Sequence, residues 1–388
     1  MVTKSQANPV PDYIPAVVIV LMAIGTVFVF SADVNLSQQH SLRAFYDFTG
    51  LRQILFFPLA CIIMYSVSRI NYRRFSFANG WYKSPTAFML VLGITLLIIV
   101  LIPRLGTEIN RARRWLRIPA GPFMISFQPS ELAKWAIVFF LVAFCDKFND
   151  TLGLYRKRFV PICLAIGIVV TLIIIEDFGT AAFITLLAFL LLIIAGVKLW
   201  HILTLVPFGA VAFCAALLSS PARVRRIAAF LNPEKWADSA AYQANQSLIA
   251  LGSGGLWGRG LGRGICKYGH LPEDTTDFIF AIIGEELGFV GTAVVIGLFI
   301  AFVWLGILVV SRCKDGFGKL LACGIVLTIA TQAALNIGVV TVVLPTKGIP
   351  LPFVSAGGTS MLLSAAAVGV LMNIAKQSPK PKAGEKKR

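Results

Sequence analysis

Long apolar runs recur from one end of the chain to the other, and they restrict the possible folds more than any other feature. Each run has about 20 residues, the length of a helix that crosses the ~30 Å hydrocarbon core of a bilayer. Charged residues make up only 14% of the chain, against about 25% in soluble domains. The sequence therefore predicts an all-α polytopic membrane protein with about ten transmembrane helices, at 13–31, 51–70, 85–103, 129–145, 159–176, 178–197, 199–219, 280–311, 319–341 and 357–375.

Basic residues are concentrated in alternate loops and in the C-terminal tail. Because cytoplasmic loops are enriched in Lys and Arg, these loops and both termini are predicted to be cytoplasmic. The predicted organisation is a cytoplasmic tail at 1–12, one ten-helix membrane domain at 13–375 and a basic, disordered cytoplasmic tail at 376–388. The net charge of +17 lies mostly on cytoplasmic flanks, so it gives no reason to expect nucleic acid as a partner.

The largest polar segment, 220–279, separates the seventh and eighth predicted spans and should lie on the outer side of the membrane. It is too long for a simple connection, so we expect it to fold over the membrane surface. The apolar run that follows reaches from Phe278 to Val310, which exceeds an untilted span. We therefore expect a half-buried helix at 278–287 that precedes the true span.

Five arginines share one short loop on the predicted outer side: Arg104, Arg111, Arg113, Arg114 and Arg117. Short outer loops are normally poor in Lys and Arg, so this cluster indicates a bound anion. Guanidinium groups match phosphate oxygens, but basic clusters beside a membrane also bind anionic lipid headgroups, and both interpretations stay open. A second basic set favours a phosphorylated ligand: Arg223, Arg225, Arg226, Arg259, Arg263 and Lys267.

Two other features accompany the basic sets. Trp115, within the arginine loop, is either an interfacial tryptophan or a platform for a sugar ring. Lys347, in the proline-rich segment LPTKGIPLPFVSAGGTS at 344–360, adds another outer cation.

Carboxylates inside or next to apolar runs are candidates for chemistry. Glu131 and Lys134 lie one helical turn apart in an apolar run, where charges are costly unless paired; a purely structural ion pair is the simplest interpretation. Asp277 directly precedes the apolar Phe278. Partial desolvation there would raise its basicity toward that of a general base, although it could also serve only as a first-turn acid on the helix dipole.

Together these segments resemble the SEDS family (shape, elongation, division and sporulation). The resemblance rests on FQPSELAK, EDFGTA, YQANQSLIALGSGGLWGRGLG, LPEDTTDFIFAIIGEELGFVG and LPTKGIPLPFVSAGGTS, and it covers the chain from about the third span to the last. It implies a SEDS-type fold with ten spans. The glycine-dense stretch, IGEELG and LPTKG favour the division branch over the elongation branch.

The resemblance implies a peptidoglycan glycosyltransferase in the bacterial cytoplasmic membrane, which polymerises lipid II on the outer face during cell division. Such an enzyme works with a class B penicillin-binding protein and other divisome proteins. The donor leaves as a lipid diphosphate, and a single inversion needs one base and no covalent glycosyl-enzyme. No cofactor is implied with certainty, and dependence on a divalent cation stays open.

The resemblance also assigns residues. The family's catalytic carboxylate falls on Asp277, its loop tryptophan on Trp115, and its QPSE glutamate and following lysine on Glu131 and Lys134. The predicted substrate-binding residues are Trp115, Arg111, Arg113, Arg114, Arg223, Arg226, Lys347 and Ser355, the serine of the SxGG motif.

The chain departs from the family pattern in a few places. Thr275 stands where His is common, and Ala356 stands where Tyr is common. Ile175-Glu176 and Phe178 differ from the usual residues around the DLGT turn. None of these changes removes the predicted base.

Two other function classes remain: a lipid II flippase or transporter, suggested by buried charges, and an inactive scaffold that positions a penicillin-binding protein. An elongation-type polymerase is a third alternative. The partner is expected to dock on the lipid-facing sides of spans eight and nine, through small residues that permit close helix contact: Gly291, Ala293, Gly297 and Gly324.

Overall fold

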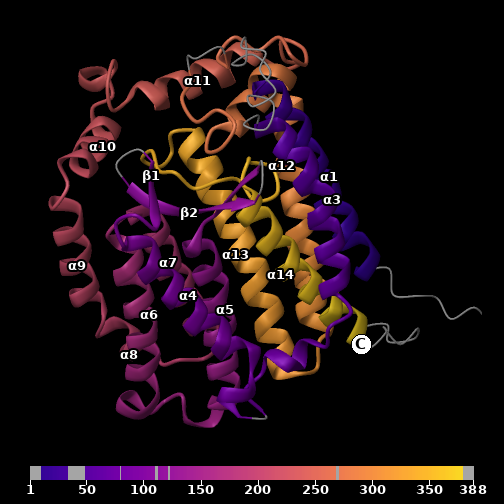
Figure 1. Ribbon diagram of the computed structural model, residues 1–388, viewed down its shortest axis with the longest axis vertical. Coiled ribbons are helices and arrows are strands. Elements are labelled where there is room, and N and C mark those ends of the chain that lie inside the picture. The colour runs from indigo at the N-terminus through magenta and orange to yellow at the C-terminus, as the bar shows by residue number, and fades with distance from the viewer. Residues whose placement is uncertain are drawn as a thin grey trace, which may run out of the picture.

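The computed structural model describes residues 10–33, 49–78, 80–109, 112–120, 123–267 and 271–378. Its long helices run side by side along the longest axis of the molecule (Figure 1). The helices are α1 (Val10–Asp33), α3 (Thr49–Val67), α4 (Pro85–Leu101), α5 (Pro129–Lys147), α6 (Val160–Ile174), α7 (Phe178–Ile194), α8 (Leu199–Leu203), α9 (Val206–Leu218), α10 (Pro221–Leu231), α11 (Tyr242–Gly254), α12 (Ile279–Arg312), α13 (Gly316–Val340) and α14 (Gly358–Gln377). Short 3₁₀ or π turns occur at η1 (Tyr72–Phe75), η2 (Trp81–Lys83), η3 (Asn149–Thr151), η4 (Tyr155–Phe159) and η5 (Glu234–Trp236).

The two ends of the helix bundle differ. The sheet end carries α10, α11 and three short strands, and the far end carries η1 and the last turn of α14 (Figure 1). The last turn of α1 reaches the sheet end, where Ser31 donates a hydrogen bond to Glu286. From there α1 extends back along the bundle to Val10. The side of the membrane on which each terminus lies stays a prediction.

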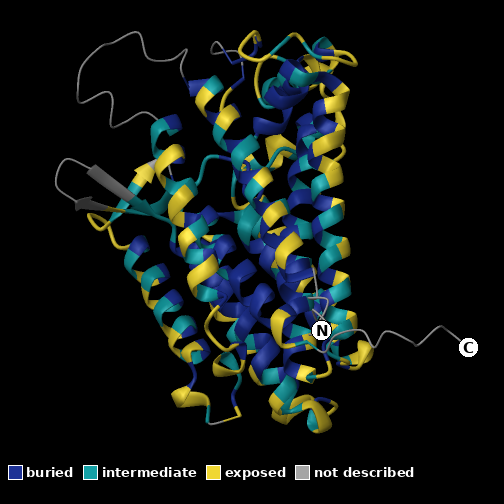
Figure 2. Ribbon diagram, turned by 90° about the vertical axis from the view of Figure 1, so that its right-hand side faces the viewer, coloured by how far each residue is buried: buried dark blue, intermediate teal, exposed yellow. Residues whose placement is uncertain are grey.

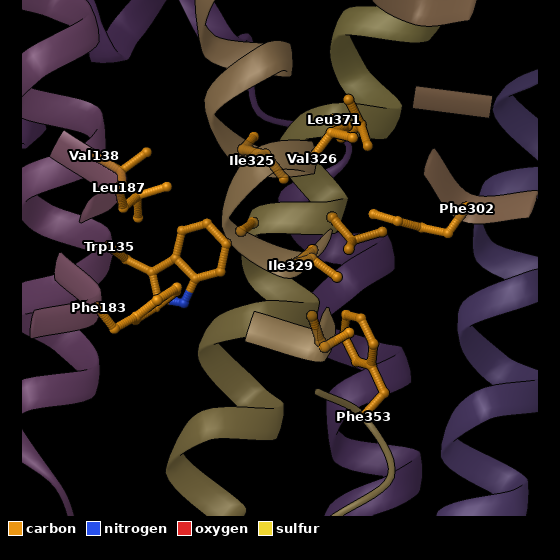
Figure 3. Close-up of a cluster of buried hydrophobic side chains, with 14 of the residues drawn as sticks. Trp135, Val138, Phe183, Leu187, Phe302, Ile325, Val326, Ile329, Phe353 and Leu371 are labelled. Carbon is orange, nitrogen blue, oxygen red and sulfur yellow. The ribbon is translucent and has the colours of Figure 1, made fainter. Parts of the chain in front are cut away.

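The core lies between α5, α7, α12, α13 and α14, where apolar side chains from all five helices meet. Figure 3 shows part of this cluster, with Trp135, Val138, Phe183, Leu187, Phe302, Ile325, Val326, Ile329, Phe353 and Leu371. The exposed positions lie on the outward faces of the helices (Figure 2). Helix α9 has no buried residue at all and stands at the edge of the bundle. These outward faces are largely apolar, as expected of a protein surrounded by lipid.

Seven helices of the described chain are long and apolar enough to cross a membrane. They are Val10–Asp33, Thr49–Val67, Tyr155–Ile174, Leu199–Leu218, Ile279–Arg312, Gly316–Val340 and Gly358–Gln377. The other three predicted spans coincide with the shorter apolar helices α4 and α7 and with the charged helix α5. The helical, multi-pass architecture is therefore confirmed, and the number of ten crossings stays a prediction.

The arginine loop contains an element that the all-α prediction missed. It forms an antiparallel sheet in the order β1 (Gly106–Ile109), β2 (Ala112–Ala120) and β3 (Phe123–Phe127). Trp115 on β2 faces Thr107 on β1. The start of α14 holds the sheet, because Thr359 Oγ1 donates to the Ser126 carbonyl, at 3.2 Å. Arg113, Arg114 and Arg117 are thus fixed on β2.

Helix α12 is interrupted at Gly288, whose backbone angles are φ 67° and ψ −160°. After this break the Phe289 N–H donates to the Gly255 carbonyl, and the Val290 N–H donates to the Leu256 carbonyl. The glycine-rich stretch supplies partners that the helix lacks at its break. The prediction of a separate helical segment at 278–287 before the span is confirmed.

Helices α1 and α14 extend slightly into the two predicted tails, since α1 begins at Val10 and α14 ends at Gln377. Most of both tails, at 1–9 and 379–388, lies outside the described residues.

Candidate functional site

A cavity of about 160 Å³ opens at the sheet end between α7, α9, α10 and the loop that precedes α14. Four cationic side chains line it: Arg114, Arg223, Arg226 and Lys347. The remaining lining residues are Glu176, Asp177, Phe178, Gly179, Phe213, Leu217, Ile227, Pro345, Thr346 and Gly348. The structure thus brings together cations from three segments that are more than 100 residues apart in the sequence.

The strand β2 docks on the turn between α6 and α7. The Arg114 guanidinium donates to the Glu176 carbonyl through Nε and Nη2, at 3.0 and 2.8 Å, and lies 3.6 Å from the Asp177 carboxylate. The Arg113 N–H donates to the Glu176 carboxylate at 2.8 Å. Asp177 also caps α7, since its carboxylate accepts from the Thr180 N–H. The acidic pair at this turn therefore fixes the strand that delivers Arg114.

The four cations of the cavity are not equivalent. Arg223 donates to the carbonyls of Ala216 and Ile174, at 2.7 and 3.0 Å. Arg226 and Lys347 have no hydrogen-bond or ion-pair partner among the described residues. Burial lowers the pKa of both groups, although Arg226 is exposed to the cavity. Unpaired cations in a partly desolvated cavity form a site suited to an anion.

Phe178 provides an aromatic surface between two of these cations. The Arg223 guanidinium lies 5.2 Å and the Lys347 ammonium 5.3 Å from the ring centre. Cation–π contacts of this kind orient both groups without using their hydrogen-bond donors.

Asp277 contacts the wall of the cavity at Gly348. A Cβ atom on Gly348 would lie 2.9 Å from Asp277 Oδ2, so the carboxyl group fills the space that a side chain would need. Gly348 itself lines the cavity. Asp277 is therefore placed next to the cation-lined space.

Protein atoms surround the Asp277 carboxyl group, although part of the residue remains accessible. This desolvation is the main cause that raises its pKa to about 7. The negative charges of Glu273 and Asp177 raise the pKa further, whereas Arg114 and Arg226 lower it. A carboxylate with such a pKa exchanges a proton near neutral pH, as a general base must.

Ser355 holds backbone near the site. Its hydroxyl donates to the Thr276 carbonyl and accepts from the Leu351 N–H, the latter at 2.7 Å. The next residue, Ala356, donates its N–H to the Thr275 carbonyl at 2.9 Å. The two departures from the family pattern, Thr275 and Ala356, are therefore direct neighbours.

The predicted ion pair between Glu131 and Lys134 is present and buried, at 2.7 Å. Lys134 also donates to the Gln332 side-chain carbonyl on α13, at 2.8 Å. Gln332 in turn donates to the Pro350 carbonyl, at 2.9 Å. The pair is thus connected to the loop that carries Lys347.

Other predicted residues lie elsewhere. Trp115 is on β2 but is not among the residues that line the cavity. Arg113 forms an ion pair with Glu108 at 3.3 Å. Arg111 lies outside the described residues.

Lys267 corrects the interpretation of the second basic set. It is buried, and its ammonium group pairs with Glu286 at 2.8 Å. Glu286 also accepts from the Gly262 N–H, and Glu285 accepts from the Ile265 N–H. Lys267 therefore helps to fasten the glycine-rich stretch to α12 and does not face the cavity.

Sequence reasoning missed Gln332 and Asn336, both buried on α13. The Asn336 amide nitrogen donates to the carbonyls of Asp277 and Ile349, at 2.7 and 2.8 Å. A signal was present, because two amides one helical turn apart interrupt an apolar run. Among the described residues, no group of three His, Cys, Asp or Glu side chains is arranged to hold a metal ion.

The fold and the site define a polytopic membrane protein with a raised-pKa acid beside a cation-lined cavity. Over residues 12–380 the chain matches the family model FTSW_RODA_SPOVE, described as a cell cycle protein. It is 36% identical to stage V sporulation protein E of Bacillus subtilis, over 97% of this chain and 100% of that protein. It is 38% identical to a probable peptidoglycan glycosyltransferase FtsW of Nitrosococcus halophilus, over 97% of this chain and 95% of that protein. The chain belongs to the FtsW/RodA/SpoVE family.

Solved structures agree on the fold. A chain of a peptidoglycan synthase complex that coordinates polymerization and crosslinking matches with a TM-score of 0.70 at 22% identity, over 94% of this chain and 96% of that one. The rod shape determining protein RodA of Thermus thermophilus matches with a TM-score of 0.64 at 22% identity, over 95% and 97% of the two chains.

Proposed function

We propose that this protein is a peptidoglycan glycosyltransferase that polymerises lipid II into glycan strands during cell division. The observation that carries the proposal is the position of Asp277, whose pKa is raised to about 7, beside a cavity with two unpaired cations. The names of its relatives, probable peptidoglycan glycosyltransferase FtsW, point to the same reaction.

The Asp277 carboxylate acts as the general base. Asp277 accepts the proton of the acceptor sugar hydroxyl while that oxygen attacks the anomeric carbon of the donor. The new C–O bond forms as the bond to the lipid diphosphate breaks, with one inversion and no covalent enzyme intermediate. The negative charge that remains on the diphosphate needs cations that are not already paired.

Arg226 and Lys347 supply those cations. A bound diphosphate replaces the water that solvates them and offsets their desolvation, and their charge stabilises the leaving group as it develops. Arg114 contributes charge from the strand, and Arg223 mainly holds α10 against the ends of α6 and α9. Trp115, which does not line the cavity, and Arg111, which lies outside the described residues, remain predicted substrate contacts.

The orientation follows from this reaction. The sheet end lies on the outer face of the cytoplasmic membrane, and both termini are cytoplasmic. The described cavity then faces the side on which glycan strands are built.

The test is polymerisation of labelled lipid II by the purified protein, with products sized on a gel. Long strands are expected from the native protein, and none from Asp277→Ala at equal amounts of folded protein. Near-native strand synthesis by Asp277→Ala would remove the general-base assignment. Failure of the native protein to make strands, even with a cognate penicillin-binding protein present, would contradict the proposed function.

The partner is a class B penicillin-binding protein that crosslinks the strands and docks in part on α12. The structure corrects the predicted contact residues: Gly291 and Gly324 are buried, whereas Gly297 has open space around it and Ala293 is exposed. Gly297→Trp should therefore weaken co-purification with the partner. Unchanged co-purification would show that the partner does not dock on this face of α12.

A further inference from the structure

Hydrogen bonds from two other segments hold the backbone of the segment that carries Asp277. Three successive carbonyls, those of Thr275, Thr276 and Asp277, accept hydrogen bonds from the Ala356 N–H, the Ser355 hydroxyl and the Asn336 amide. The donors come from the loop before α14 and from α13. The acid therefore has little freedom to move relative to that loop.

The same loop is held by α13 at two neighbouring carbonyls. Asn336 donates to Ile349 at 2.8 Å, and Gln332 donates to Pro350 at 2.9 Å. The two side chains are four residues apart, so they project from one face of the helix. Lys347 and Gly348, which line the cavity, directly precede these two fixed carbonyls.

The Asn336 amide uses its donor fully and leaves its acceptor unused in the described structure. Its nitrogen faces two carbonyl oxygens, which fixes the orientation of the amide. Its Oδ1 is buried and has no hydrogen-bond partner in the described structure. A buried acceptor without a partner destabilises the fold, and an apolar side chain of similar size would avoid that cost. The bridge to Asp277 and Ile349 is the evident gain.

Gln332 extends this bridge to the buried ion pair. Its side-chain carbonyl accepts from the Lys134 ammonium at 2.8 Å, and Lys134 pairs with Glu131 at 2.7 Å. A continuous set of hydrogen bonds therefore runs from α5 through Gln332 to the Pro350 carbonyl. Because a buried ammonium group needs all its partners, Lys134 fixes the rotamer of Gln332.

We propose that Asn336 and Gln332 are positioning residues that set the distance between the Asp277 carboxylate and the cavity cation Lys347. Asn336 bridges the two segments directly, and Gln332 transmits the rigidity of the Glu131–Lys134 pair to the loop. The inference rests on the proposed function, because the distance matters only if base and leaving group act in one reaction. The loop has a glycine where it passes Asp277, since a Cβ atom on Gly348 would lie 2.9 Å from Asp277 Oδ2.

The first test is Asn336→Asp, which keeps the size of the side chain but replaces the donor by an oxygen that faces two carbonyls. We expect kcat for lipid II polymerisation to fall about 10–100-fold, the effect of a misplacement of about 1 Å, with KM little changed. Hydrogen–deuterium exchange should become faster at 275–278 and 347–351. This exchange measurement does not depend on activity.

A matched control exists at the far end. Asn373 on α14 is also buried, and its amide donates to the Ser68 carbonyl and accepts from the Tyr72 N–H, at 2.9 and 3.0 Å. Asn373→Asp should lower the melting temperature and leave kcat per folded molecule unchanged. Equal loss of kcat in both variants would show that Asn336 is merely structural.

Gln332→Glu provides a second variant if Asn336→Asp does not fold. It keeps an oxygen for Lys134 but removes the donor to Pro350. We therefore expect kcat to fall and hydrogen–deuterium exchange at 347–351 to become faster, as in Asn336→Asp. Native kcat and native exchange in this variant would overturn the proposal.

Asp277→Ala, assayed in parallel, separates the two claims. If Asp277→Ala is inactive while the Asn336 and Gln332 variants are fully active, only the positioning inference fails. If Asp277→Ala remains active, the base assignment of the proposed function fails, whatever the positioning variants do.

Discussion

Asn336 and Asn373 are two buried amides at opposite ends of the same bundle, and their surroundings differ. At the far end, Asn373 Oδ1 accepts from both the Tyr72 N–H and the Gln377 side chain, and its nitrogen donates to the Ser68 carbonyl. At the sheet end, Asn336 Oδ1 has no partner in the described structure.

The same contrast extends to the charges. At the far end, Asp315 caps α13 at the Gly318 N–H and accepts from the Tyr72 hydroxyl, both at 3.0 Å. At the sheet end, Arg226 and Lys347 line a cavity and have no hydrogen-bond or ion-pair partner within the described part of the chain. The cations that line the cavity are available for a ligand, whereas the paired groups at the far end stabilise the fold. This division of roles predicts large effects on activity at the sheet end and small ones at the far end.

The largest effect is expected at Asp277. Asp277→Asn and Asp277→Ala should reduce polymerisation by about 10²–10⁴-fold, the usual contribution of a general base. The matched far-end variant is Asp315→Asn, which keeps a good N-cap residue and should retain activity. Strand synthesis from lipid II by equal amounts of folded protein measures both. Comparable losses in the two variants would contradict the division between the ends.

The unpaired cations should come next. Arg226→Gln combined with Lys347→Gln should raise KM for lipid II. The value of kcat/KM should fall at least about 10–100-fold, the loss that corresponds to a single hydrogen bond to a charged group at about 1.5–3 kcal/mol. Initial rates at varied lipid II concentration measure the change.

The far-end cation Lys376, whose ammonium donates to the Ser68 hydroxyl at 3.3 Å, provides the control for this pair. Lys376→Gln should leave KM unchanged. If the double variant also keeps native kinetics, the cavity cations do not hold the diphosphate.

A smaller effect concerns pH. Burial raises the pKa of Asp277 to about 7, so the base is increasingly protonated below that pH and kcat/KM should decline on the acid side. Arg226 lowers this pKa. Arg226→Gln should therefore raise it and move the acid-side decline of kcat/KM (the acid limb of the pH profile) to higher pH. Stability has the opposite pH dependence: the fold favours the protonated form, so this group stabilises most below its unfolded pKa and loses that contribution as pH rises through about 7.

Asp274 provides the control for the pH profile, because burial raises its pKa to about 6. Asp274→Asn should leave the limb near pH 7 in place. Disappearance of that limb in Asp274→Asn would assign the titration to Asp274 and not to Asp277.

The helices were predictable because apolar runs of membrane length leave few alternatives. The break at Gly288 was predictable for the same reason, since the run from Phe278 to Val310 exceeded one span. The sheet was not predictable, because the charges of the arginine loop do not reveal strand pairing. Thr359 and Glu176, which hold the sheet in place, come from distant segments.

The site was predictable in part. The raised pKa of Asp277 followed from its place before Phe278, and the Glu131–Lys134 pair followed from helical spacing. The roles of individual cations did not, because only the fold shows that Lys267 pairs with Glu286, while Lys347 has no ion-pair partner among the residues that the structure describes. Which of several cations forms an ion pair depends on the tertiary structure, and a single sequence does not show it.

The smallest effect is expected for Tyr72→Phe at the far end. This change removes the hydrogen bond from the Tyr72 hydroxyl to Asp315 at 3.0 Å and keeps the ring that stacks on Phe317, with centroids 6.2 Å apart. Loss of one such hydrogen bond should lower the free energy of unfolding by about 1 kcal/mol, which thermal unfolding in detergent measures. Polymerisation per folded molecule should not change, because this contact reaches neither Asp277 nor the cavity. Slower polymerisation by Tyr72→Phe would mean that packing at the far end governs the geometry of the site, and the two ends would then have to be treated as one coupled unit.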